Sequence, residues 1–189
     1  MKKNIFAFAF AFMLLVSCGI CFGQTKKSEE DLQYKLLATT KTSTMQKELD
    51  ETAAKGYRIL VGSPTSGTEM AIFLSREATA EQPYQYKLLA TTKTGTMQKE
   101  INEAATNGFR LLPRTMIAKA QLIAGVEIVM ILEKPPVVEK KYDYKLLATT
   151  LTSTLQKEVT DAQSAGYVIV GMVSRGEHMV IMERESSAK

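Results

Sequence analysis

One lysine and a pair of threonines recur three times in this chain, at fixed places in a repeated sequence. In each copy the threonines follow the lysine by four and five residues. Hydroxyl groups, ammonium groups and the free N–H groups at a helix start can together bind an anion or a glycan. The sequence therefore contains a candidate binding rim, which consists of Lys35, Thr39, Thr40, Lys87, Thr91, Thr92, Lys145, Thr149 and Thr150.

The part of the repeat that contains this rim also varies least. From the first tyrosine to the Gln-Lys-Glu sequence, the first two copies differ only at Ser43 and Gly95, whereas the sequences that follow differ much more. A contact between neighbouring repeats would restrain this part in the same way as a ligand site. The two interpretations, a contact surface and a binding rim, both remain open.

The other reactive side chains do not form a catalytic group. The single histidine, His178, has no counterpart in the other copies. Three glutamates do recur, but each follows a lysine on a predicted helix and suits a solvated ion-pair face: Glu48, Glu100 and Glu158. General acid–base catalysis needs a nucleophile or a tuned pair in one pocket. We therefore predict that the protein is not an enzyme.

Metal or cofactor binding is not indicated either. Met172, Met179 and Met182 lie near His178, and thioethers bind Cu(I). Methionine at strand core positions is more simply a filler of gaps in the core. The glycines mark turns and form no phosphate-binding loop. The sequence predicts no metal site and no cofactor.

The N-terminal 23 residues are typical of an export signal. Two lysines precede an apolar run over residues 5–16, and small residues follow. The run is shorter than the roughly 20 residues that a membrane-spanning helix needs. We expect residues 1–23 to be an export signal and the protein to be secreted into the periplasm or beyond the cell.

Two ways of processing this signal remain open. Cys18 follows Leu-Val-Ser and resembles the cysteine of a bacterial lipobox, which implies acylation and an inner- or outer-membrane lipoprotein. The alternative is cleavage after Gly23 without a lipid. Both cysteines lie in this segment, so the folded body has no disulfide.

The charge pattern excludes nucleic-acid binding. Without Lys2 and Lys3 the chain has 22 basic and 20 acidic residues, and the lysines alternate with acids. Nucleic-acid recognition requires a basic stripe or patch.

The repeat itself predicts the fold. Each copy begins Tyr-Lys-Leu-Leu-Ala-Thr-Thr, and a glycine follows the tyrosine at a distance of 22 residues (Gly56, Gly108 and Gly166). The opening alternates as a strand does, and the next stretch has apolar residues at helical spacing. The glycine ends the helix in the left-handed conformation, and two further strands follow. The fold class is α+β: three tandem β-α-β-β units, each with one helix on a three-stranded, mostly antiparallel sheet whose third strand lies in the middle.

The predicted units span residues 34–77, 86–134 and 144–185. The second unit contains an insertion, 113–125, that extends a hairpin or covers a neighbour. Ser43 with Gln46, and Ser153 with Gln156, have the spacing of a capping box at a helix start.

The sheet faces away from the helices are expected to be apolar. We expect this face to carry Leu37, Leu60, Ala71 and Phe73 in the first unit, Leu89, Leu112, Val129 and Ile131 in the second, and Leu147, Val168, Val170, Val180 and Met182 in the third. Burying a large apolar side chain is worth about 1.5–3 kcal/mol. The sequence therefore predicts that these faces pack against one another, or against a partner.

The order of Tyr-Lys-Leu-Leu, an amphipathic helix, a glycine followed by an aromatic residue, and two strands resembles a small bacterial family called domain of unknown function 4177. The resemblance covers Tyr34 to Glu185 three times over. The family typically has tryptophan after the glycine, where this chain has Tyr57, Phe109 and Tyr167. The family has no established activity, so the resemblance implies no site residues.

We therefore expect an exported, non-enzymatic envelope protein that acts by protein binding or assembly through apolar sheet faces. A glycan or anion binder that uses the threonine and lysine rim is one alternative. An inhibitor of a secreted hydrolase, acting through residues 113–125, is another. Self-association or a protein partner is expected, with no nucleic acid, and with membrane contact only through a lipid anchor.

Overall fold

The computed structural model describes residues 32–65, 68–77, 82–121 and 125–186 of the chain. All of them lie in one compact unit that begins at Leu32. The predicted export signal at residues 1–23 and the predicted lipidation at Cys18 lie outside the described residues.

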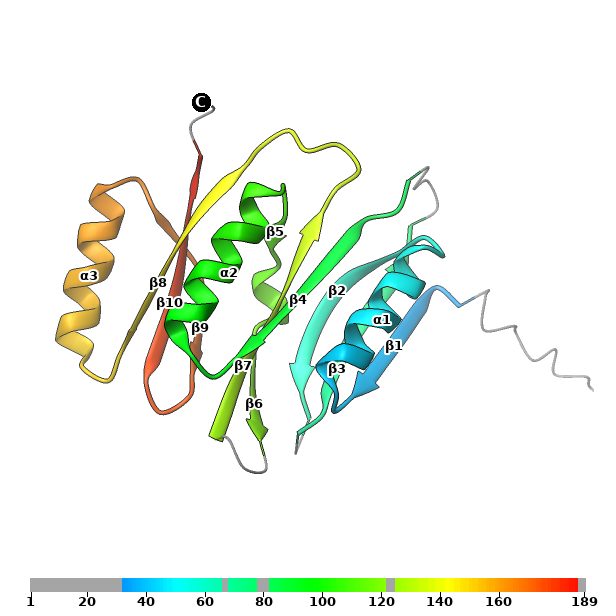
Figure 1. Cartoon of the computed structure of the whole chain (residues 1–189), viewed down its shortest axis with the longest axis horizontal. Helices are drawn as coiled ribbons and strands as arrows, with labels where there is room; N and C mark the ends of the chain where they lie inside the picture. Colours follow the sequence, from blue (N-terminus) through cyan, green and yellow to red (C-terminus); the bar gives the residue numbers. More distant parts are fainter. Residues whose placement is uncertain (1–31, 66–67, 78–81, 122–124, 187–189) are drawn as a thin grey trace, which may run out of the picture. The chain divides into compact units, whose positions relative to one another are not determined.

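The described residues form a mixed α+β fold with three α-helices and three antiparallel sheets (Figure 1). The first segment consists of β1 (Tyr34–Thr39), α1 (Thr42–Ala53), β2 (Tyr57–Pro64) and β3 (Met70–Arg76). The second consists of β4 (Gln85–Thr91), α2 (Thr94–Thr106), β5 (Arg110–Leu111), the 3₁₀ helix η2 (Pro113–Thr115), β6 (Ile117–Gln121) and β7 (Gly125–Lys134). The third consists of β8 (Tyr142–Thr149), α3 (Thr152–Ser164), β9 (Val168–Ser174) and β10 (His178–Glu185).

The predicted strand order is confirmed. The three sheets have the orders β1-β3-β2, β4-β7-β5 and β8-β10-β9, so the last strand of each segment lies in the middle. The predicted number of strands is wrong for the second sheet, where β6 also pairs with β7 and makes four strands instead of three. This strand is antiparallel to both neighbours.

The glycine that ends each helix has the predicted backbone conformation. The φ angles of Gly56, Gly108 and Gly166 are 81°, 87° and 85°. A Cβ atom is costly in this left-handed region, which explains why glycine recurs at this place.

The predicted capping boxes are wrong. α1 and α3 begin at Thr42 and Thr152, one residue before the predicted serine caps, and neither N-cap residue makes a side-chain capping bond. The glutamine three residues after each serine is therefore available for another contact, and in α1 this contact is with the next sheet.

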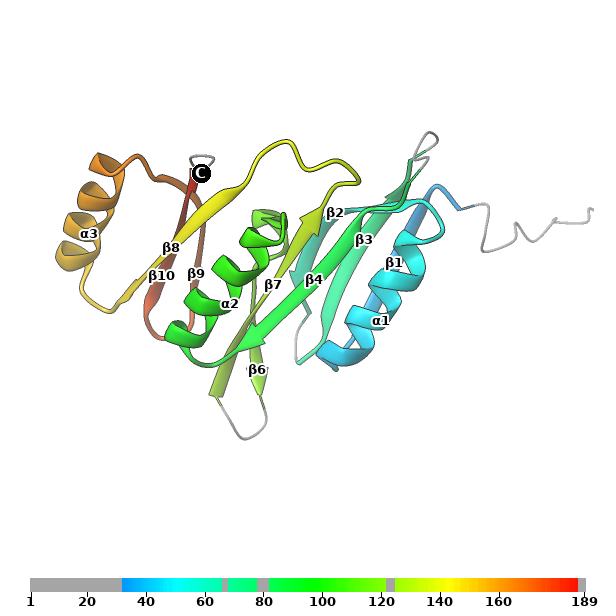
Figure 2. The same ribbon diagram turned by 45° about the horizontal axis from the view of Figure 1, so that its top comes forward.

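The sheets stack with a helix between neighbours (Figures 1 and 2). α1 packs on β1 and β2 of its own sheet and also contacts β4 of the second sheet, and α2 lies in the same way between β4 and β8. The first apolar core therefore includes Tyr86, Val129 and Ile131 of the second sheet. The second core includes Tyr144 and Ile181 of the third sheet.

The far faces of the second and third sheets pack against the preceding helix, so the prediction that the sheet faces pack against one another is wrong, and so is part of the face assignment. Five residues expected on the far side belong to cores that contain their own helix: Leu37, Leu89, Leu147, Val180 and Met182. Val129, Ile131 and Leu112 do face the preceding helix, as expected. Both sides of each sheet are apolar, so alternation identifies two faces without identifying which one the helix covers.

The insertion in the second segment extends the sheet and also covers both neighbours. β6 pairs with β7 in antiparallel register. An added Cβ at Gly62 in β2 would lie 3.3 Å from the Cα atom of Thr115, and one at Gly171 in β9 would collide with Met116. The absence of a side chain at these two glycines allows the insertion to approach both β2 and β9.

Candidate functional site

An ion pair and a tyrosine join the first sheet to the second. Arg58 in β2 donates from Nη2 to Oε1 of Glu133 in β7 at 2.8 Å, and from Nε to Oε2 at 3.0 Å. The hydroxyl of Tyr86 donates to Glu133 Oε2 at 3.0 Å and accepts from the backbone N–H of Ile59 at 3.1 Å. The Tyr84 ring lies 4.2 Å from the Arg58 guanidinium. The junction thus links Arg58 and the N–H of Ile59 in one sheet to Glu133 and Tyr86 in the next.

The second junction repeats the same arrangement. Arg110 in β5 forms a bidentate pair with Glu183 in β10. Tyr144 donates to Glu183 Oε2 at 3.1 Å and accepts from the N–H of Leu111 at 2.9 Å. The ring of Tyr142 lies 4.2 Å from the Arg110 guanidinium.

The environment of both tyrosines keeps their hydroxyl groups protonated. Burial, and next the negative charge of Glu133, raise the pKa of Tyr86 above its usual value. Burial, and to a lesser extent Glu183, raise the pKa of Tyr144 in the same direction. Hydrogen bonding to Glu133 is the main cause that raises the pKa of Arg58. Each junction therefore has a fixed donor, a fixed carboxylate acceptor and a permanent cation.

A glutamine attaches each of the first two helices to the edge strand of the next sheet. Gln46 of α1 donates to the carbonyl oxygen of Tyr86 at 3.0 Å and accepts from the N–H of Leu88 at 2.7 Å. Gln98 of α2 makes the same two bonds, to Tyr144 and Leu146, at 2.9 and 2.7 Å. A helix side chain thus pairs with an exposed strand edge.

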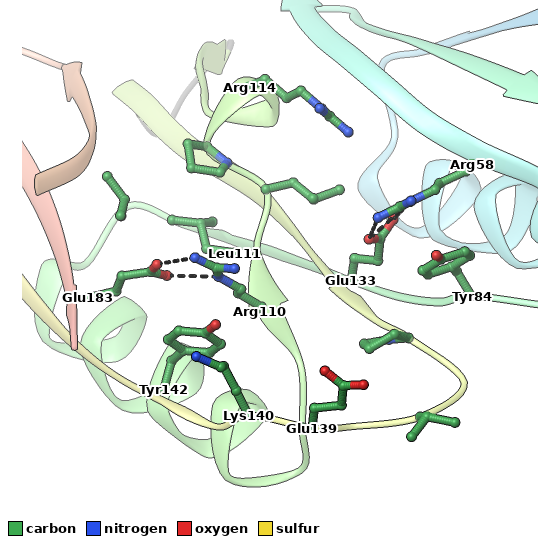
Figure 3. A pocket seen from close by; sticks show the side chains of 16 residues that line it. Arg58, Tyr84, Arg110, Leu111, Arg114, Glu133, Glu139, Lys140, Tyr142 and Glu183 are labelled. Atoms are coloured by element: carbon green, nitrogen blue, oxygen red, sulfur yellow. Dashed lines mark hydrogen bonds and ion pairs between the residues drawn. The ribbon is translucent and has the colours of Figure 1, made fainter. Parts of the chain in front are cut away.

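A cleft of about 680 Å³ lies over the two junctions. Its walls come from β2, β5, η2 and the connection that leads to β8 (Figure 3). The arginines that line it are already bonded within the chain: Arg58 and Arg110 to their glutamates, and Arg114 to the carbonyl oxygen of Ile59 at 2.8 Å. The cleft offers a ligand few unpaired charges, and we assign its side chains a structural role.

The threonines of the predicted rim divide into two groups. The first threonine of each pair accepts a bond from the backbone N–H two residues later, at 3.3 Å for Thr39 and 3.1 Å for both Thr91 and Thr149. The second is exposed in all three copies, at Thr40, Thr92 and Thr150. The first group therefore shapes the turn into the helix, and only the second group presents free hydroxyls.

The three lysines of the predicted rim lie in different surroundings. Lys145 Nζ lies 5.2 Å from the centre of the Tyr167 ring. Lys87 lines a cleft of about 450 Å³ with Ser43 and Gln46 of the first segment and two acids, Glu100 and Glu103. Lys35 is half-buried on β1. The rim is thus divided among three strand ends, and its residues do not converge on one cavity of the described structure.

The histidine and the methionines near it do not converge on one point. Met179 belongs to the second core and Met182 to the third, so they lie on opposite sides of β10. His178 Nδ1 lies 3.4 Å from the hydroxyl of Ser174. Among the described residues, no group of three His, Cys, Asp or Glu side chains could hold a metal ion.

One face of the first sheet is uncovered by any described residue. We call it the open face; it consists of Tyr34, Leu36, Leu60, Val61 and Phe73. Tyr34 is 60 % exposed, whereas the equivalent Tyr86 and Tyr144 are 4 % and 3 % exposed. Phe73 is 46 % exposed, although its equivalents Ile131 and Ile181 are buried. In the other two sheets, the preceding helix covers this side.

At the opposite end of the stack, no sheet of the described residues covers the outer side of α3. We call it the α3 end; it consists of Leu155, Gln156, Val159, Ile169 and Met172, together with the neighbouring Val168 on the edge strand β9. Ile169 is 56 % exposed, whereas the equivalent Ile59 and Leu111 are 0 % and 3 % exposed. Leu155 and Val159 are half-buried, although the equivalent residues of α1 and α2 are buried.

Sequence reasoning missed the junction residues. The signal was present: a basic residue follows the glycine and aromatic residue in the first two copies, as Arg58 and Arg110. An acid pairs in register with the opening tyrosine in the last two copies, as Glu133 and Glu183. Each arginine thus lies one copy before its glutamate, as expected for a contact between neighbouring copies.

No helix in the described part of the chain is long and apolar enough to cross a membrane. No family model matches the chain, and no curated protein and no solved structure matches it either.

Proposed function

We propose that the protein is an exported, non-enzymatic envelope protein that acts by protein binding or assembly, and that its open face is the binding surface. It is built as a tandem array of three β-α-β-β units, related to the family called domain of unknown function 4177. Export proceeds through residues 1–23, and the mature protein is either secreted freely or anchored through a lipid on Cys18.

The exposure of the open face carries this proposal. Tyr34 and Phe73 are exposed at positions where the other two sheets bury their equivalents under a helix. Leu36 is exposed as well, and its equivalents Leu88 and Leu146 are half-buried. Apolar patches of this kind mark protein interaction sites. Burying each large side chain of the face would contribute about 1.5–3 kcal/mol.

The internal junctions indicate what chemistry the partner has. In both of them the covering element is an amphipathic helix with a glutamine that bonds the edge strand. A partner with such a helix would fit the open face by the same helix-on-sheet contact. The occupant we propose is therefore a protein with an amphipathic helix.

Site-specific photo-cross-linking tests the proposal. Phe73 is replaced by a photoreactive phenylalanine analogue, and irradiation is carried out in the intact envelope. The expected result is an adduct of defined mass that disappears when Leu36→Glu is added. Lys47, whose side chain is 78 % exposed on α1, is the matched control position and should give no adduct. Equal yields at both positions, or none at Phe73, would refute a specific binding face.

N-terminal mass spectrometry of the purified protein tests its processing. A diacylglyceryl group on Cys18 would show the lipoprotein, and a free N-terminus at Gln24 would show simple secretion. An unprocessed Met1 would contradict export.

A further inference from the structure

We propose that the partner of the open face is a second copy of this chain, which docks its α3 end there in a head-to-tail manner. Such docking presupposes the proposed function, because it needs the open face to be a protein-binding surface. The contact would reproduce between two chains the junction that the chain forms twice within itself.

Each end of the stack carries one half of the internal junction without its other half: the helix glutamine is at the α3 end, and the tyrosine is at the open face. Gln156 is the counterpart of Gln46 and Gln98, and it makes only a local contact to Thr160 at 3.4 Å. Tyr34 is the counterpart of the two junction tyrosines, and its hydroxyl has no hydrogen bond to any described residue. In the proposed contact, Gln156 of one copy donates to the carbonyl oxygen of Tyr34 and accepts from the N–H of Leu36 in the second copy. The Tyr34 hydroxyl of the second copy accepts from the N–H of Ile169 in the first.

The charged residues of the junction are replaced at both ends together. Val168 stands where the internal junctions have Arg58 and Arg110. At the other end Ser75, the register partner of Tyr34, stands where they have a glutamate. A glutamate there would have no arginine to pair with in the second copy, and a buried unpaired carboxylate is costly. The two ends are thus complementary, because both have an uncharged residue where the internal junctions have an ion pair.

The stacked aromatic ring is replaced in the same way. Tyr84 and Tyr142 lie against their arginines, and the equivalent residue of the first segment is Leu32. Val168 and Leu32 are both exposed. A valine and a leucine would form an apolar contact in place of the arginine and the tyrosine.

The last helical turn shows a compensating change in size. Lys141 Nζ donates to the carbonyl oxygen of Thr106 at 3.0 Å, so the end of α2 lies beside the start of the next sheet. The last turn carries Ala53 in α1 and Ala105 in α2, and Gln163 in α3. The larger glutamine would face the start of β1, where Leu32 is smaller than the tyrosines of the other two sheets.

Terminal capping alone does not account for these ends. A capping segment is expected to have a polar outer face. The α3 end instead exposes Val168, Ile169 and Met172, and the open face exposes an aromatic and aliphatic surface. Because the two surfaces differ, the contact is heterologous, and it closes into a ring or continues as a filament.

Sedimentation of two variants, alone and mixed, tests the inference. Phe73→Glu blocks the open face and Ile169→Glu blocks the α3 end. Both residues are exposed, so the variants should keep the melting temperature of the parent protein. If Phe73→Glu fails to fold, Leu36→Glu replaces it. The parent protein should form species that grow with concentration, and each variant should be monomeric. An equimolar mixture of the variants should form a 1:1 dimer, because one intact surface of each kind remains.

A charge exchange sharpens the same test. Val168→Arg alone and Ser75→Glu alone should each weaken association at least about tenfold, since each places an unpaired charge in the contact. A protein that contains both changes should recover association, because the internal ion pair is then rebuilt between chains.

Three results that involve this chain alone would overturn head-to-tail docking. They are a strictly monomeric parent protein, dimers of Ile169→Glu that show two open faces bound to each other, and a cross-link from Phe73 to residues before Leu32 of the same chain. An adduct of Phe73 with a different protein would also overturn it but would leave the proposed function intact. The absence of any adduct would refute the proposed function itself.

Discussion

Arg58 and Glu133 are 75 residues apart in sequence and belong to different sheets, yet they form a bidentate ion pair at 2.8 and 3.0 Å. The carboxylate is almost fully buried, and the arginine is about one third exposed. The pair therefore holds a buried negative charge at the contact between two sheets, and Arg110 and Glu183 do the same at the next contact.

Removal of the arginine should destabilise the protein more than removal of the whole pair. Arg58→Ala leaves Glu133 buried without its cation, and we expect a loss of about 2–3 kcal/mol, below the range for fully buried pairs because the arginine is partly in water. Arg58→Met combined with Glu133→Leu should lose less, since no charge is left unpaired. Urea denaturation measures both, and a larger loss in the double variant would show that the pair itself stabilises the junction.

The buried tyrosines should make the protein sensitive to alkaline pH. The folded protein raises the pKa of Tyr86 above the value near 10 of the unfolded chain. Stability that depends on the neutral hydroxyl is therefore complete below about pH 10 and is lost as the pH rises towards the raised pKa. Thermal melts from neutral pH upward should show this loss in the parent protein.

Tyr86→Phe should make the loss of stability at alkaline pH smaller. At neutral pH it should lower the free energy of unfolding by about 2–3 kcal/mol, because Glu133 and the N–H of Ile59 both lose a partner. Tyr34→Phe is the matched control, since Tyr34 is exposed and should leave the stability profile of the monomer unchanged. An equal effect of the two changes would contradict the role assigned to the junction tyrosine.

The junction glutamines should differ from their counterpart at the free end. Gln46→Ala removes two hydrogen bonds to the edge of β4, and we expect a loss of about 1–2 kcal/mol. Gln156→Ala should change the stability of the monomer by less than about 0.5 kcal/mol, and should weaken self-association. Comparison of their denaturation curves at low protein concentration tests the difference.

Close approach of the insertion should make Gly62 sensitive to a methyl group. The Cβ of Gly62→Ala would lie 2.7 Å from Cδ1 of Ile72 and 3.3 Å from the backbone of Thr115. We expect a loss of about 1–3 kcal/mol, as for other overpacked sites. Gly95→Ala is the control, because nothing lies within 4 Å of its Cβ and alanine favours the helix. It should leave the melting temperature unchanged or raise it.

The sequence was sufficient to predict the repeated elements and their strand order, but not η2 and β6, which lie in the insertion. The alternation from Tyr34, the helical spacing that begins at Met45 and the glycine at Gly56 all reflect local backbone requirements. These requirements are the same in each copy, and the structure confirms them at all three glycines.

The sequence was not sufficient to predict how the segments contact one another. Leu36 and Leu37 are identical in chemistry, so alternation cannot show which of them lies under the helix. The partner of Gln46 is on a strand 40 residues later, and local spacing suggested a helix cap instead. Such contacts depend on where whole sheets are placed, which a short sequence pattern does not encode.

The measurement that tests the head-to-tail contact most directly is residue-resolved amide hydrogen exchange on the purified protein, dilute and concentrated. Inside the chain, the N–H groups equivalent to that of Leu36 donate to a helix glutamine; they belong to Leu88 and Leu146. The N–H groups equivalent to that of Ile169 donate to a tyrosine hydroxyl; they belong to Ile59 and Leu111. We predict that both amides exchange rapidly in dilute protein and are protected together as the concentration rises, while amides of α2 do not change. Unchanged exchange at both, or protection at Leu36 alone, would contradict the account.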